Sequence, residues 1–160
     1  MKRTPRSASL VVAGLLFTLS AAASAQCNVA RNRCTVGVSV DKAGNVVLQP
    51  VDLVNDTGRK KTRIIWKLDN GYWFDTAAGD GVFFKNPPAG SVKPGDEFYD
   101  NYATTDDLGT HKPDFKPTRY HWRNRNEKPY TFQYEIRFHD SGNRPYILDP
   151  TITNNAGLGK

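Results

Sequence analysis

The chain has 160 residues, of which 38% are hydrophobic and 24% are charged, and its formal net charge is +6 at pH 7. From a chain of this length we expect one domain with a single core rather than a multidomain architecture.

The first 26 residues have the organisation of a secretory signal peptide. Basic residues open the segment, an apolar run covers residues 10–19, and residues 23–25 form the A-x-A site Ala-Ser-Ala. We therefore expect cleavage of residues 1–25 and a periplasmic or secreted mature protein of residues 26–160. The apolar run is shorter than the roughly 20 residues of a membrane-spanning helix, so we do not expect an integral membrane protein.

Removal of this leader changes the charge of the protein. Three basic residues and no acidic residue leave with it, so 19 basic residues remain against 16 acidic ones, a net charge of +3. Such a charge is ordinary for solubility and does not support nucleic-acid binding. We expect no nucleic-acid partner.

Two cysteines, Cys27 and Cys34, remain in the mature chain with six residues between them. An even pair in an exported protein predicts a disulfide, which by the chain-entropy model contributes roughly 2.5 kcal/mol. A metal or redox pair fits less well, because the spacing is not C-x-x-C. A lipoprotein is disfavoured because Gln26 stands where lipoprotein signals carry a small residue.

Alternation of apolar and polar residues dominates the mature chain and predicts strands with one buried face. In chain order the predicted strands cover residues 34–40, 46–54, 64–68, 72–74, 82–84, 119–123, 130–138 and 146–148. Pro50 marks an edge or a bulge in the second of them. The short polar link at 124–129 predicts that its two flanking strands form a hairpin.

These strands and their turn signals predict an all-β fold. We expect an antiparallel β-sandwich of about seven or eight strands, immunoglobulin-like or cupredoxin-like, with a closed barrel as the alternative.

Residues 65–68 read Ile-Trp-Lys-Leu before a Gly-aromatic turn, the alternating strand 130–138 follows, and residues 148–152 read Leu-Asp-Pro-Thr-Ile. In these features, over roughly residues 60 to 154, the chain resembles small secreted proteobacterial β-sandwich proteins of uncharacterised function. The resemblance implies the fold and the compartment, and it implies no activity or site residue.

A long loop at 86–117 interrupts the regular succession of short strands and turns. It is rich in proline and glycine and holds six of the 16 acidic residues. A connection this long is uncommon in a compact domain and is usually functional or disordered. We therefore expect a site here.

Four residues of this loop offer ligands for a metal ion: Asp100, Asp106, Asp107 and His111. Hard cations such as calcium take carboxylate oxygens in flexible loops, but no EF-hand spacing occurs, so a solvated acidic loop is the competing interpretation. A blue-copper centre is disfavoured, because the mature chain has no methionine and its cysteines are expected to be bonded. We expect no cofactor.

Aromatic residues supply the candidates for a binding face. Tyr72 and Trp73 lie beside a Gly-rich turn, and Tyr99 and Tyr102 lie in the long loop. Exposed aromatic rings stack on sugars or anchor protein partners, whereas buried ones belong to the core.

A basic run at residues 59–63 is a candidate anion-binding patch together with Arg119, His121, Arg123 and Arg125. In an exported protein the relevant polyanions are lipid head groups or acidic glycans. Protection of an edge strand by basic residues is the competing interpretation.

No catalytic motif is present. The sequence lacks G-x-S-x-G and H-E-x-x-H, and the adjacent acids Asp106 and Asp107 are not placed across a glycosidic bond. We therefore interpret the protein as a non-catalytic exported module that binds an unknown protein or glycan of the cell envelope. Two alternatives stay open: a metal-binding envelope protein that uses the acidic loop and histidines, and a hydrolase whose site is assembled from loops.

The mass of the exported protein tests both the predicted cleavage of the leader after residue 25 and the predicted disulfide. We expect an N-terminus at Gln26 and a gain of two hydrogen atoms on reduction, because both cysteines are bonded to each other. A Cys34→Ala variant should be cleaved at the same position and show no gain. A lipid-modified Cys27 would contradict the assignment.

Overall fold

The computed structural model describes residues 26–28, 32–48, 52–53, 61–106 and 116–154. The predicted signal peptide and the segment 107–115 lie outside these residues. Among the described residues, no helix is long and apolar enough to cross a membrane.

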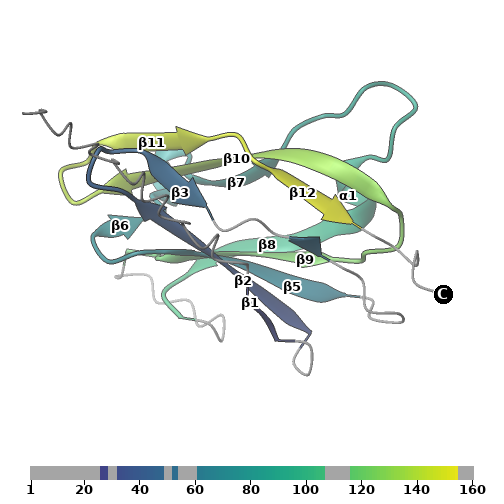
Figure 1. The fold of residues 1–160 in the computed structure, drawn as a ribbon, viewed down its shortest axis with the longest axis horizontal. Coiled ribbons are helices and arrows are strands. Elements are labelled where there is room, and N and C mark those ends of the chain that lie inside the picture. Colours follow the sequence, from purple (N-terminus) through teal and green to yellow (C-terminus); the bar gives the residue numbers. More distant parts are fainter. Residues whose placement is uncertain (1–25, 29–31, 49–51, 54–60, 107–115, 155–160) are drawn as a thin grey trace, which may run out of the picture.

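Two β-sheets pack against each other around one apolar core (Figure 1), which confirms the predicted all-β sandwich. The first sheet has the order β1-β2-β5-β9-β8, and β3 pairs with β2. Its strands are Gln26–Asn28 (β1), Arg33–Val40 (β2), Val46–Leu48 (β3), Thr62–Leu68 (β5), Phe98–Thr104 (β8) and Arg119–Asn124 (β9).

The second sheet has the order β11-β10-β12-β4, and β6 and β7 also pair with the long central strand β10. Its strands are Asp52–Leu53 (β4), Tyr72–Trp73 (β6), Gly81–Phe84 (β7), Tyr130–Asp140 (β10), Pro145–Leu148 (β11) and Thr151–Asn154 (β12). A 3-10 helix covers Thr76–Ala78, and a single helical turn, α1, covers Pro94–Glu97. The pairs β2–β5 and β4–β12 are parallel, so the sandwich is not wholly antiparallel.

Alternation identifies the buried face of the central strands correctly. In β10, Phe132, Tyr134, Ile136 and Phe138 are buried, as their spacing predicts. In β2, Cys34, Val36 and Val38 are buried in the same way.

The predicted hairpin between 119–123 and 130–138 is wrong. Strand β9 pairs with β5 and β8 in the first sheet, whereas β10 is the centre of the second sheet. The link between them therefore crosses from one layer to the other. Its backbone is tied to α1, because the Arg125 amide donates to the Glu97 carbonyl at 2.7 Å.

Two other boundaries differ from the prediction. The strand predicted over 46–54 appears as β3 and β4, which belong to different sheets. The long loop at 86–117 contains α1 and the strand β8. A register shift between Tyr99 and Tyr102 breaks the alternation of β8, so its period of two is not readable from the sequence.

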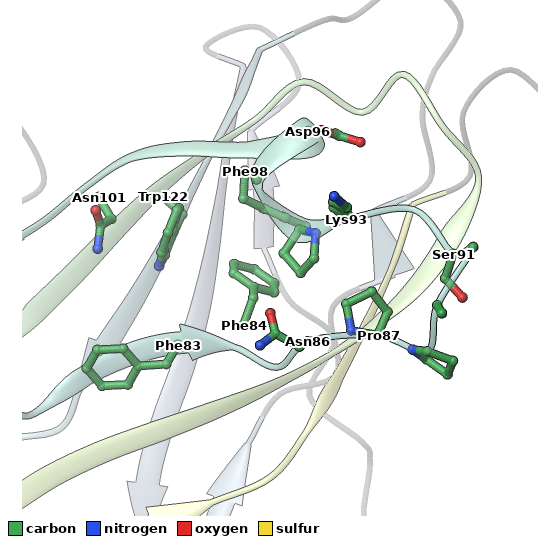
Figure 2. Close-up of a pocket in the computed structure, with 15 residues that line it drawn as sticks. Phe83, Phe84, Asn86, Pro87, Ser91, Lys93, Asp96, Phe98, Asn101 and Trp122 are labelled. Carbon is green, nitrogen blue, oxygen red and sulfur yellow. The ribbon is translucent and has the colours of Figure 1, made fainter.

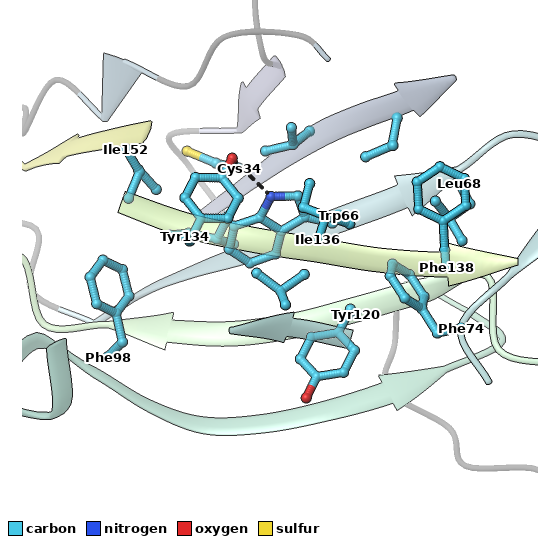
Figure 3. Close-up of a cluster of buried hydrophobic side chains, with 14 of the residues drawn as sticks. Cys34, Trp66, Leu68, Phe74, Phe98, Tyr120, Tyr134, Ile136, Phe138 and Ile152 are labelled. Atoms are coloured by element: carbon cyan, nitrogen blue, oxygen red, sulfur yellow. Dashed lines mark hydrogen bonds between the residues drawn. The ribbon is translucent and has the colours of Figure 1, made fainter. Parts of the chain in front are cut away.

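The core is held together by a contact between the two sheets. Trp66 of β5 and Tyr134 of β10 are fully buried, with ring centroids 5.4 Å apart in an edge-on arrangement. The Trp66 indole N–H donates to the Tyr134 hydroxyl at 3.2 Å (Figure 3). This bond satisfies a donor that would otherwise be buried without a partner.

The sheets approach each other closely at Gly81, the first residue of β7. A Cβ atom there would lie 2.8 Å from the ring of Tyr120, and the backbone has a φ of +154°. Only glycine accommodates both conditions, because any side chain would displace the tyrosine.

The N-terminal strand sets the two cysteines opposite each other. In the antiparallel pair of β1 and β2, Cys27 is the partner of Cys34. Opposed residues in such a pair have Cα atoms about 4.5–5.5 Å apart, within the range a disulfide needs. The Cys27 side chain lies outside the described residues, so the disulfide stays a prediction that this register supports.

Alkaline pH should weaken the fold through Tyr134. Burial raises the pKa of Tyr134 to about 12 from an ordinary value of 10.0, and the hydrogen bond from Trp66 offsets only part of this rise. Because the folded pKa is the higher one, the stabilising contribution is complete below pH 10 and is lost as the pH rises toward 12.

A Tyr134→Phe variant should show less of this alkaline loss in urea denaturation as a function of pH. At neutral pH it should be less stable by about 1–3 kcal/mol, because the buried indole N–H loses its acceptor. Tyr130→Phe on the same strand keeps Tyr134 and should retain the alkaline loss. Equal alkaline behaviour of the wild type and Tyr134→Phe would contradict the assignment.

Candidate functional site: an aromatic pocket beside a bulged edge strand

A pocket of about 730 Å³ lies where edge strands of the two sheets approach each other. Strand β7 of the second sheet contributes one side, and β8 and β9 of the first sheet contribute the other. The connection from Asn86 to Asp96 closes the end (Figure 2). The volume falls in the range of small-molecule sites.

The apolar lining of the pocket is mainly aromatic. Phe84 and Phe98 stack at 3.8 Å between centroids with an interplanar angle of 19°, and Trp122 meets the Phe84 ring edge-on at 5.3 Å. The Trp122 indole N–H donates to the Val82 carbonyl at 2.9 Å, which fixes the indole relative to β7. Phe83 is 38% exposed at the mouth. A pocket with a rigid floor thus has one partly exposed ring at its mouth, and the Arg137 guanidinium lies over this ring, 5.4 Å from its centre.

Polar groups line the mouth of the same pocket. They are Asn86, Ser91, Lys93, Asp96 and Asn101. Figure 2 shows Asn101 beside Trp122 on one side and Ser91 with Pro87 on the other. Amide, hydroxyl and charged groups around an aromatic floor are suited to a ligand that is apolar on one face and polar at its edge.

A β-bulge in β8 positions this mouth. Tyr99 faces Arg123 and Tyr102 faces His121, so Asp100 and Asn101 together oppose the single residue Trp122. Asp100 has a left-handed φ of +56°, a conformation that aspartate tolerates better than most residues.

The bulge sends its two residues in different directions. Asp100 forms an ion pair with Arg123 at 2.9 Å. Asn101 lines the pocket, and its amide donates to the Tyr120 hydroxyl at 2.8 Å. Burial raises the pKa of Tyr120, and this hydrogen bond opposes the rise.

A buried polar network supports the turn α1 behind the pocket. Glu97 is fully buried, and its Oε2 accepts from the Glu127 amide at 2.8 Å and from the Asn154 amide side chain at 3.2 Å. Asn124 donates in turn to Asn154 at 2.7 Å. The network joins α1 and β9 to β12 of the second sheet, so it closes this end of the sandwich.

Tyr72 and Trp73, two of the predicted binding residues, lie in the second sheet away from this lining. Tyr72 packs edge-on against Phe138 and Tyr146 at 5.7 and 5.6 Å. Trp73 is 9% exposed, and the Lys116 ammonium lies 3.4 Å from the centre of its ring. Both side chains contribute mainly to packing.

Tyr99 and Tyr102, the other two, share the outer face of the first sheet. Tyr102 stacks on His121 at 4.7 Å with an interplanar angle of 7°, and the Arg125 guanidinium lies 4.7 Å from the ring centre of Tyr99. A period of two would place residues three apart on opposite faces. The extra residue of the bulge brings them to the same one.

His121 is fixed beneath Tyr102. The Thr104 hydroxyl donates to the Asp106 carbonyl at 2.7 Å, so it accepts from the His121 ring, whose Nε2 lies 2.9 Å away. His121 is fully buried although it faces outward from the core, and it is therefore part of the packing of this face.

The predicted metal ligands are described only in part. Asp107 and His111 lie outside the described residues, and Asp100 is engaged with Arg123. Within the described ranges, no three His, Cys, Asp or Glu side chains are grouped as metal ligands. The four-residue metal site stays a prediction.

A second polar pair, Asp80 and His139, lies at the opposite end of β7. The His139 Nδ1 is 2.6 Å from Asp80 Oδ2, and the same oxygen accepts from the Asp75 amide at 2.9 Å. A carboxylate that orients an imidazole supplies two of the three members of a catalytic triad, and the third is a nucleophile. Among the described residues, His139 has no hydrogen bond to a hydroxyl or thiol, and the pair ties the turn at 75–80 to β10.

No protein-family model matches the chain, and no curated protein is significantly similar to it. A proposal about function therefore rests on the geometry described above.

Sequence reasoning located the pocket only in part. The sequence predicts a strand at 82–84 and a site in the long loop at 86–117, but it does not mark Asn101 or Trp122 as part of a pocket. Trp122 sits in an alternating strand, a pattern typical of core residues. No local signal marks the bulge that turns Asn101 toward it.

Replacing Glu97 tests the support of the pocket. We expect Glu97→Ala to lower the free energy of unfolding by about 3 kcal/mol, because one buried and one partly buried donor lose their acceptor. Glu97→Gln keeps one acceptor oxygen and should cost less. The neighbouring Asp96→Ala is the control, since Asp96 is exposed and its pair with Lys128 spans 3.5 Å. Urea denaturation measures all three, and equal stabilities would contradict the network's role.

Proposed function

We propose that this protein is an exported, non-catalytic binding module that holds a sugar ring of a cell-envelope glycan in the aromatic pocket. The observation that carries the proposal is the combination of an exposed ring, Phe83, with amide groups at the mouth of one cavity.

The chemistry of a sugar matches this lining. A pyranose presents C–H groups on one face, which pack against an aromatic ring, and hydroxyl groups at its edge, which need donors and acceptors. Phe83 and Trp122 supply rings, while Asn86 and Asn101 supply both donors and acceptors. A purely apolar ligand would leave the remaining hydrogen-bonding groups of these amides unpaired, which is unfavourable.

Preorganisation supports the same proposal. Trp122 is held by the Val82 carbonyl, and Asn101 is held by Tyr120. Side chains that are already fixed lose little conformational freedom when a ligand binds. Export is the expectation from the leader, and it would place the module among envelope glycans.

Titration with soluble envelope glycans tests the proposal. The probes are a muropeptide digest and N-acetylglucosamine oligomers, followed by calorimetry and by tryptophan fluorescence. Phe83→Ala should weaken binding about tenfold, the loss typical of an anchoring aromatic ring. Ile147→Ala is the matched control, because Ile147 is a large apolar residue of the second sheet that is 61% exposed.

A control must show that the ligand-dependent change in tryptophan fluorescence comes from Trp122 in the pocket. A Trp122→Phe variant should lose the ligand-dependent change, since Trp66 and Trp73 lie elsewhere and are buried. Absence of binding by the wild type, or equal weakening by Phe83→Ala and Ile147→Ala, would overturn the proposal.

A further inference from the structure

A row of three arginines crosses the outer face of the first sheet, and the proposed function does not use it. The register sets Arg33 of β2 opposite Arg63 of β5, and Arg63 opposite Arg123 of β9. Tyr99 of β8 continues the row next to Arg123. Strands in a sheet are about 4.8 Å apart, so the arginines form an evenly spaced line of positive charge.

This row is not the protection of a sheet edge. Strands β5 and β9 lie in the interior of the first sheet, with β2 on one side and β8 on the other. Their neighbours already satisfy the backbone groups that basic residues would guard at an edge.

The row has little internal compensation. Arg123 pairs with Asp100, but within the described part of the chain neither Arg33 nor Arg63 forms an ion pair. Like charges directly opposite each other destabilise a sheet. Both arginines remain partly accessible, so an external anion is able to reach them.

Further cations and rings surround the row. Four residues along the strands, Lys67 lies opposite Arg119, whose guanidinium donates to the Thr105 carbonyl at 2.6 Å. Tyr102 lies between these positions and the arginine row, and the bulge keeps it on the same face as Tyr99. The face therefore carries two rows of basic residues, with the two tyrosines of β8 beside them.

We propose that this face binds an acidic polysaccharide, with Arg33 and Arg63 pairing with its carboxylates and the two tyrosines contacting its sugar rings. An evenly spaced line of cations suits a polymer whose charges repeat at a fixed interval, whereas a lipid surface offers no such line. Arginine also pairs with carboxylate through two parallel hydrogen bonds. The proposal does not depend on a ligand in the pocket.

Binding to alginate, a carboxylated polysaccharide, tests the proposal on the purified exported protein. Neutral dextran is the control polymer, and vesicles containing phosphatidylglycerol are the lipid comparison. Arg33→Gln/Arg63→Gln should weaken alginate binding about tenfold and reduce its dependence on salt, because two ionic contacts are lost. Lys42→Gln/Arg144→Gln removes the same charge from exposed turns and should change binding less than twofold.

A thermal melt separates loss of the site from loss of the fold. The Arg33→Gln/Arg63→Gln variant should melt at the same temperature as the wild type or above it, since repulsion across the row is relieved. Phe83→Ala should bind alginate like the wild type, so failure of the pocket proposal is distinguishable from failure of this one. Equal weakening by both double variants, no binding to alginate, or binding to vesicles alone would overturn the inference.

Discussion

The contact between Trp66 and Tyr134 joins the central strands of the two sheets, and the rest of the sandwich is arranged around it. Trp66 lies on β5, which has β2 on one side and β9 on the other. Tyr134 lies on β10, which takes part in all strand pairings of the second sheet except the one between β4 and β12. Their hydrogen bond pairs the buried indole N–H of Trp66 with the buried hydroxyl oxygen of Tyr134.

One extra residue in β8 gives the molecule two different surfaces. The bulge at Asp100 and Asn101 turns one residue toward Arg123 and the other toward the pocket. It also returns Tyr99 and Tyr102 to a common face. Bulges re-aim side chains without changing the strand order, so a pocket and a basic face share one edge strand. Proposed binding on both sides of β8 is a consequence of this geometry.

Sequence reasoning succeeded where the information is local. The alternation in β2 and β10 identified strands and their buried faces, because a side chain's direction follows from its own backbone. It failed for the pairing of β9 with β10, because a short polar link serves a hairpin and a crossing between sheets equally well. It also missed β8, whose bulge disrupts the period of two on which strand prediction depends.

The sequence alone determined the all-β class, the buried faces of the regular strands and the presence of both basic and aromatic residues in the middle of the chain. Only the tertiary structure decided that Arg33, Arg63 and Arg123 stand in one row and that Phe83, Asn101 and Trp122 share one cavity. The physical reason is that strand register and layer packing join residues that are distant along the chain. A shift of one residue reverses the face on which each side chain lies.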